Sequence, residues 1–153
     1  MELGSIEREL YVDAAPTTVF AVVSDPHHVA QWWPDRADYE PTPGASGDLT
    51  FGDPADGGVT VALTVVSSEP PHTFAFRWTH PAGETATAAN SLLVTFHLMP
   101  SGAGTLLRMT ATGFRERGWE AATLEQQYGE HVTGWDHYLP RLTAYAATLP
   151  AHP

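Results

Sequence analysis

The sequence predicts an α+β domain in which a curved antiparallel sheet of about six or seven strands covers one long C-terminal helix. Three observations carry this prediction. Extended segments with one apolar face recur through most of the chain, two short helices are marked near its start, and apolar residues recur at helical spacing near its end. A strand with one apolar face and a helix with one apolar stripe each need a partner, so the two should pack together.

The first strand is expected from Ile6 to Val12, where apolar and polar residues alternate with one exception. Pro16 then fits the first turn of a helix, where its missing N–H costs nothing. Asp25 is a good N-cap for a second helix, and Pro26 fits its first position. This second helix should be short, from His27 to about Gln31.

Six further extended segments are separated by Gly, Pro and Asp residues. They are Ala37–Thr42, Gly47–Gly52, Val59–Ser67, His72–Trp78, Ser91–Met99 and Thr105–Thr112. The last two are joined by a short glycine-containing loop, which predicts a hairpin. Each of the last three segments places its large apolar residues on one face, so the sheet should cover the helix on one side only.

The C-terminal segment has the strongest helical pattern in the chain. Apolar residues recur every three to four positions from Leu124 to Leu149, for about seven turns, which indicates an amphipathic helix. Gly129, Gly134 and Pro140 interrupt the pattern. Pro140 cannot donate to the Asp136 carbonyl, so it should kink the helix or split it.

Length and charge limit the class of protein. The 153 residues suit one domain, expected at 1–150 and followed by a short tail at 151–153. Eighteen Asp and Glu against seven Lys and Arg give a formal charge of −11, which disfavours binding to nucleic acid or to an anionic membrane. Cysteine is absent, no run of about 18 apolar residues could span a bilayer, and no signal peptide is evident. We therefore expect a soluble cytoplasmic protein.

Several motifs resemble one known superfamily. Ile6 to Pro16, followed by Val19-Phe20, resembles the opening of START/SRPBCC proteins, which have the helix-grip fold. Other motifs resemble its activator of heat-shock protein 90 ATPase-like family. They are Ser24-Asp25-Pro26 before Trp32-Trp33, Pro70-Pro71 before Phe74–Trp78, Val94–Leu98, Gly104-Thr105 before Leu107–Thr110, Gly113-Phe114 and Gly134-Trp135. The resemblance implies binding of lipids, hormones or polyketides, or in a few members cyclisation or dehydration.

No catalytic constellation, metal site or cofactor site is predicted. The eight histidines lack metal-ligand spacing, and no Gly-x-Ser-x-Gly motif is present. A cavity enzyme, such as a cyclase or dehydratase, remains an alternative, and its polar groups would be His131, Tyr128 and Arg77. Arg77 has the wrong parity against Phe76 and Trp78, which counts against it. A chaperone-ATPase-activating interaction protein is a third alternative, implied by the family name.

The aromatic residues point most directly to a function. Five Trp, five Tyr and six Phe are many for a small core. Large rings fill the space between a curved sheet and a helix, and some of them would also suit the walls of an apolar cavity for a small hydrophobic or aromatic molecule. The expected ligand-contacting residues are Trp32, Trp33, Phe51, Phe76, Trp78, Phe96, Met109, Tyr128, His131 and Trp135. A homodimer is compatible with the exposed edges of an open sheet.

Overall fold

The computed structural model describes residues 4–149, so the tail predicted at 151–153 lies outside the described residues. Its elements are β1 (Ser5–Val12), α1 (Pro16–Ser24), α2 (Pro26–Trp32), β2 (Arg36–Asp38), β3 (Ser46–Phe51), the 3₁₀ turn η1 (Pro54–Asp56), β4 (Val59–Glu69), β5 (Thr73–Trp78), β6 (Leu92–Ser101), β7 (Gly104–Thr112) and α3 (Ala121–Ala147). The predicted order of strand, two short helices, further strands and one long helix is confirmed.

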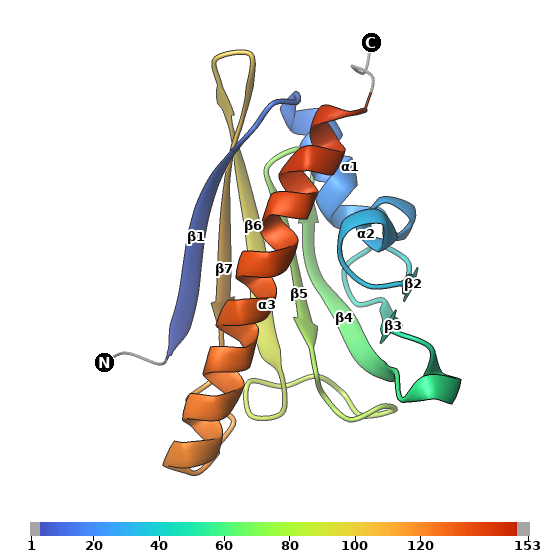
Figure 1. Ribbon diagram of the computed structural model, residues 1–153, viewed down its shortest axis with the longest axis vertical. Helices are drawn as coiled ribbons and strands as arrows, with labels where there is room; N and C mark the ends of the chain where they lie inside the picture. The colour runs from blue at the N-terminus through green and yellow to red at the C-terminus, as the bar shows by residue number, and fades with distance from the viewer. Residues whose placement is uncertain (1–3, 150–153) are drawn as a thin grey trace.

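The strands form one antiparallel sheet in the order β1-β7-β6-β5-β4-β3-β2. The predicted hairpin is the β6–β7 connection, in which Ser101 pairs with Gly104. Figure 1 shows α3 running across one face of the sheet, with α1 and α2 beside its C-terminal end. The pairing of β4 with β5 shifts between Val65 and Ser67, and such a bulge bends a strand and increases its twist. The bulge therefore contributes to the curvature of the sheet.

The alternation of each strand explains which face carries the core. Phe74, Phe76 and Trp78 of β5 are all buried, as predicted. The inward residues of β6 and β7 are buried as well: Leu92, Val94, Phe96, Leu98, Leu107, Met109 and Ala111. The one polar exception in β1 is Arg8, and its Nε lies 2.8 Å from Oδ1 of Asp136 on α3. The inward-facing Arg8 therefore joins β1 to α3 through an ion pair.

Local signals set the short helices. The Asp25 side chain accepts a hydrogen bond from the His27 N–H at 2.9 Å, so Asp25 is the N-cap of α2, as predicted. The following strand is shorter than expected and ends at Asp38. Tyr39 leaves the strand, is buried, and donates its hydroxyl to the Ser24 carbonyl at 2.7 Å. This bond ties the start of the sheet to the end of α1.

The long helix α3 is continuous over 27 residues, with Pro140 inside it, so the proline does not split the helix. Pro140 is exposed, where the carbonyl that it leaves without a donor can bond to water. The side chains of Trp135, Leu139, Leu142 and Ala146 are buried against the sheet and the short helices. None of the helices within residues 4–149 has the length and apolarity needed to cross a membrane.

Candidate functional site

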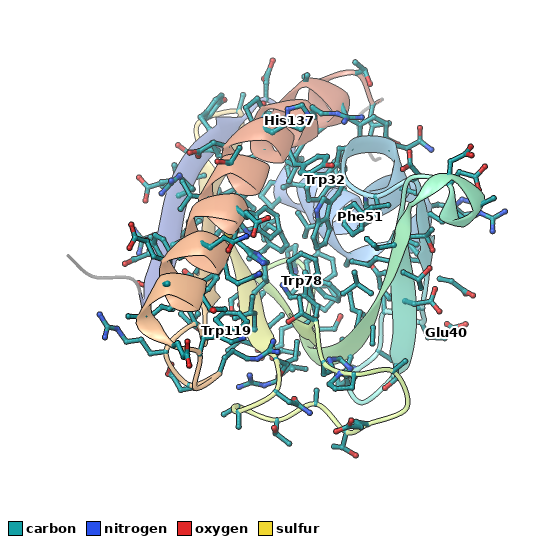
Figure 2. All side chains as sticks on the ribbon, turned by 60° about the horizontal axis from the view of Figure 1, so that its bottom comes forward. Trp32, Glu40, Phe51, Trp78, Trp119 and His137 are labelled. Atoms are coloured by element: carbon teal, nitrogen blue, oxygen red, sulfur yellow. The ribbon has the colours of Figure 1, made fainter. Side chains whose placement is uncertain are left out.

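Trp33 is the centre of an aromatic cluster between the sheet and α3. It is the C-cap residue of α2, so the end of that helix directs its indole into the fold. Its ring centroid lies 4.9 Å from that of Trp78, 5.0 Å from that of Trp135 and 5.9 Å from that of Phe51. Figure 2 shows Trp78, Phe51 and Trp32 grouped in the space enclosed by the sheet and the helices. Four parts of the chain that are distant in sequence, the end of α2, β3, β5 and α3, therefore bring their rings together.

A pocket of about 670 Å³ opens beside this cluster. Its aromatic walls are Trp33, Phe51, Trp78, Trp135 and Tyr138. His131, Gln127, Glu130, Gly134 and Val59 complete the lining, and the exposed Glu130 and Val59 mark the side that opens to solvent. Pockets of this size, lined mainly by aromatic side chains with a few polar groups, suit small organic molecules.

The structure brings together half of the ten residues expected to contact a ligand. Trp33, Phe51, Trp78, His131 and Trp135 line the pocket. Trp32, Phe76, Phe96 and Met109 lie in the buried core, and Tyr128 is half-buried, with its hydroxyl donating to the Ser5 carbonyl at 2.7 Å. The second group supports the walls rather than lining the pocket.

His131 borders both the pocket and the core. Its ring centroid lies 5.4 Å from those of Trp78 and Phe114, with nearly perpendicular planes. Burial, with a smaller contribution from the positive charge of Arg117, lowers the pKa of His131 to about 4. The imidazole is therefore neutral at pH 7 and offers one donor and one acceptor nitrogen.

Sequence reasoning missed several residues of this region. Tyr138, Gly134, Gln127, Glu130 and Val59 line the pocket but were not expected to do so. Tyr138 could have been found, because it follows Trp135 by three residues on the same helix. Val59 gave no signal, since it begins a strand next to a turn and is exposed.

Two of the three polar groups named for an enzyme, Arg77 and Tyr128, are used elsewhere in the fold, while His131 lines the pocket. The Arg77 guanidinium contacts the Ser91 hydroxyl at 3.4 Å, and Tyr128 bonds to the backbone. Within residues 4–149, no side-chain hydrogen bond joins Glu130, His131 and Tyr138, the titratable groups of the pocket. The same part of the chain holds no group of three His, Asp or Glu side chains that could bind a metal ion.

A larger hollow of about 940 Å³ lies along the outer side of α3. Its lining includes Ala122, Gln126, Gly129 and Thr133, all of which are exposed. It has one aromatic residue, Tyr138, which it shares with the smaller pocket. A ligand there would lie on exposed residues and stay largely in contact with water, so the aromatic pocket is the stronger candidate site.

An antiparallel sheet curved around one long helix, with a pocket at their junction, defines a helix-grip domain of the START/SRPBCC class. Comparison with known families agrees, because the family described as activator of Hsp90 ATPase homolog 1-like protein matches residues 13–147. The chain belongs to this family. Among curated proteins, none matches the sequence.

Solved structures show the same fold. Protein MLL2253 from Mesorhizobium loti is 23% identical with a TM-score of 0.71, and the match covers 92% of this chain and 95% of that one. The Aha1 dimer from Colwellia psychrerythraea is 17% identical with a TM-score of 0.70, over 94% and 96% of the two chains. DynU16, a protein in the dynemicin biosynthetic locus, is 25% identical with a TM-score of 0.68, over 95% of this chain and 48% of its own.

Proposed function

We propose that this protein binds a small apolar molecule with aromatic character in the pocket between β3, β5 and α3. The observation that carries the proposal is the wall of five aromatic side chains, contributed by four parts of the chain, around a space of about 670 Å³. Flat rings offer large contact areas to a flat ligand, and offset or edge-on contacts between rings add to the gain from burial. Membership of the family and the origin of DynU16 in a biosynthetic locus support it.

Gly134 provides a direct test, because it lines the pocket and a Cβ added there would meet no atom within 4 Å. Gly129 is equally free of close neighbours and lies on the same helix outside this pocket. The substitution Gly134→Met should therefore extend a side chain into the pocket, while Gly129→Met is a matched control.

The probe is N-phenyl-1-naphthylamine, an uncharged aromatic amine whose fluorescence rises in apolar surroundings. Titration should show saturable binding to the wild type and to Gly129→Met. Gly134→Met should lower the affinity about tenfold or more, as expected for 1–3 kcal/mol of overpacking. Equal affinities in all three proteins, or no saturable binding to the wild type, would overturn the proposal.

The dimeric Aha1 neighbour favours a second candidate, self-association of this chain. Each copy would carry a formal charge of −11, so repulsion between copies should oppose a dimer at low salt. Sedimentation velocity at 20 and 300 mM NaCl tests this candidate, which predicts more dimer at the higher salt concentration. A monomer at both concentrations, up to about 100 μM protein, would exclude a dimer of useful affinity.

A further inference from the structure

Arg117 lies in the segment between β7 and α3 without an acidic partner among the described residues. The ion pairs found within residues 4–149 are Arg8–Asp136 and Arg108–Glu9. Arg117 instead donates from Nη1 to the Thr79 hydroxyl at 2.9 Å and packs its guanidinium 4.7 Å from the centre of the Trp119 ring. It is half-buried, and burial lowers its pKa. In a chain with 18 acidic residues, a partly desolvated cation that has no ion pair with any acidic residue within 4–149 needs an explanation.

This cation stands close to the pocket. Thr79, which accepts its hydrogen bond, directly follows Trp78, a wall of the pocket. The charge of Arg117 also reaches His131 and contributes to lowering the pKa of that side chain. His131 lines the same pocket and contacts the Trp78 ring. The guanidinium therefore lies on the Trp78 and His131 side of the pocket, behind the residues that line it.

Residues 78–80, where Thr79 accepts the hydrogen bond from Arg117, are strained and incompletely bonded. Thr79 has φ 71°, a left-handed conformation that costs a residue with a Cβ about 1 kcal/mol or more. On either side of it, Trp78 Nε1 and His80 Nδ1 are buried without a hydrogen-bond partner in the described structure. Unpaired buried polar atoms are rare, and strain gathers at functional positions. An indole N–H can only donate, so what Trp78 lacks is an acceptor.

Two of these groups, the Arg117 guanidinium without an acidic partner and the Trp78 indole N–H without an acceptor, would both be satisfied by an anionic oxygen group. We infer that the pocket takes an aromatic acid whose carboxylate or sulfonate is held by Arg117 while its rings lie among Trp33, Trp78 and Trp135. A guanidinium binds such groups through two parallel N–H bonds, which are stronger than bonds between neutral partners. The inference rests on the proposed function and adds the ligand's charge to it.

Two probes with the same ring system test the inference. 1-Anilinonaphthalene-8-sulfonate carries a sulfonate that N-phenyl-1-naphthylamine lacks. The wild type should bind the sulfonate more tightly, despite the negative charge of the protein as a whole. Arg117→Gln should lower the affinity for the sulfonate probe about tenfold, which corresponds to the loss of one charged hydrogen bond. The affinity for the uncharged probe should stay unchanged. Arg117→Lys should retain part of the preference.

Arg36→Gln is the control, because Arg36 is exposed on β2 and the substitution removes the same charge. It should change neither affinity, and circular dichroism should show that every variant is folded. The inference fails if Arg117→Gln lowers the affinity for both probes equally or for neither. It also fails if Arg117→Gln and Arg36→Gln change the affinity for the sulfonate probe by the same factor. If the uncharged probe binds while the sulfonate shows no preference, only the acidic ligand is refuted. If neither probe binds the wild type, the proposed function fails as well.

Discussion

His131 couples the pocket to the stability of the molecule. Its pKa is lowered to about 4, whereas in the unfolded chain it should return to about 6.5. Between these values the unfolded state binds a proton that the folded state does not. Stability therefore rises with pH over this window, and it is lost as the pH falls from about 6.5 to 4.

This linkage predicts a measurable effect of His131→Gln. The free energy of unfolding of the wild type should fall by about 3 kcal/mol between pH 7 and pH 4 through this group alone. Denaturant titrations at pH 7, 5.5 and 4 should show a shallower fall in His131→Gln. His137→Gln, which removes an exposed histidine of the same helix, should follow the wild type. Parallel pH profiles for all three proteins would contradict the assignment.

A second residue-scale prediction concerns Tyr39. Its hydroxyl donates to the buried end of α1, at the Ser24 carbonyl. Tyr39→Phe keeps the ring and leaves this acceptor unpaired, so the free energy of unfolding should fall by about 1–2 kcal/mol. Tyr11→Phe, on an exposed ring, should change it by less than about 0.5 kcal/mol. Urea denaturation measures both, and equal values for the two variants would show that the bond contributes nothing.

Trp32 and Trp33 show why a site is harder to predict than a core. Both were expected to contact a ligand. Trp32 is fully buried, and its Nε1 donates to the Val22 carbonyl at 2.9 Å, while Trp33 lines the pocket. Adjacent positions give the same sequence signal. Their different surroundings follow from the way in which α2 docks, which local spacing does not determine.

At the scale of elements, α3 consists of two unlike halves. From Trp135 to Ala146 its inward residues are buried, whereas Leu124, Tyr128 and Val132 are only partly covered. The less covered half carries Gly129 and Gly134, which no close neighbour requires to be glycine. Each glycine lowers the intrinsic stability of a helix relative to alanine.

Alanine at either position should therefore stabilise the protein. We expect Gly129→Ala and Gly134→Ala to raise the free energy of unfolding by about 0.5–1 kcal/mol each. Gly113→Ala should have the opposite effect, since Gly113 has φ 106° and a Cβ there would lie 3.0 Å from the Ser91 carbonyl oxygen. The melting temperatures of the three variants test this prediction. A lower melting temperature for both Gly129→Ala and Gly134→Ala would contradict it.

Most elements could be predicted from the sequence because their periodicity is strong. The alternation from Phe74 to Trp78 and the helical stripe from Leu124 to Leu149 correctly gave one strand and one helix. The first segment after α2 was predicted as Ala37–Thr42 but pairs only at Arg36–Asp38. Tyr39 turns inward to its partner on α1, and that tertiary bond overrides the local preference for an extended strand.

At the scale of the whole molecule, the excess of negative charge produces repulsion that opposes the folded state. A formal charge of −11 is spread over a chain in which the described residues form two ion pairs, both of them exposed. Exposed ion pairs contribute little to stability, so screening them by salt costs little. Salt mainly screens the repulsion among the acidic residues.

The melting temperature should therefore rise with ionic strength. We expect an increase of several degrees between 10 and 200 mM NaCl at pH 7.5, where the Debye length falls from about 30 Å to below 10 Å. Differential scanning calorimetry at constant buffer composition measures it. A constant or falling melting temperature would show that local pairs outweigh the repulsion.

The packing of Trp33 against Trp78 and Trp135 has a consequence for observing the protein. Indole rings whose centroids lie 4.9 and 5.0 Å apart exchange excitation energy and couple their electronic transitions. All three rings line the pocket, so an incoming guest perturbs the chromophores directly. The molecule thus carries its own optical reporter, and the intrinsic emission and the near-ultraviolet dichroism of unlabelled protein should register occupancy.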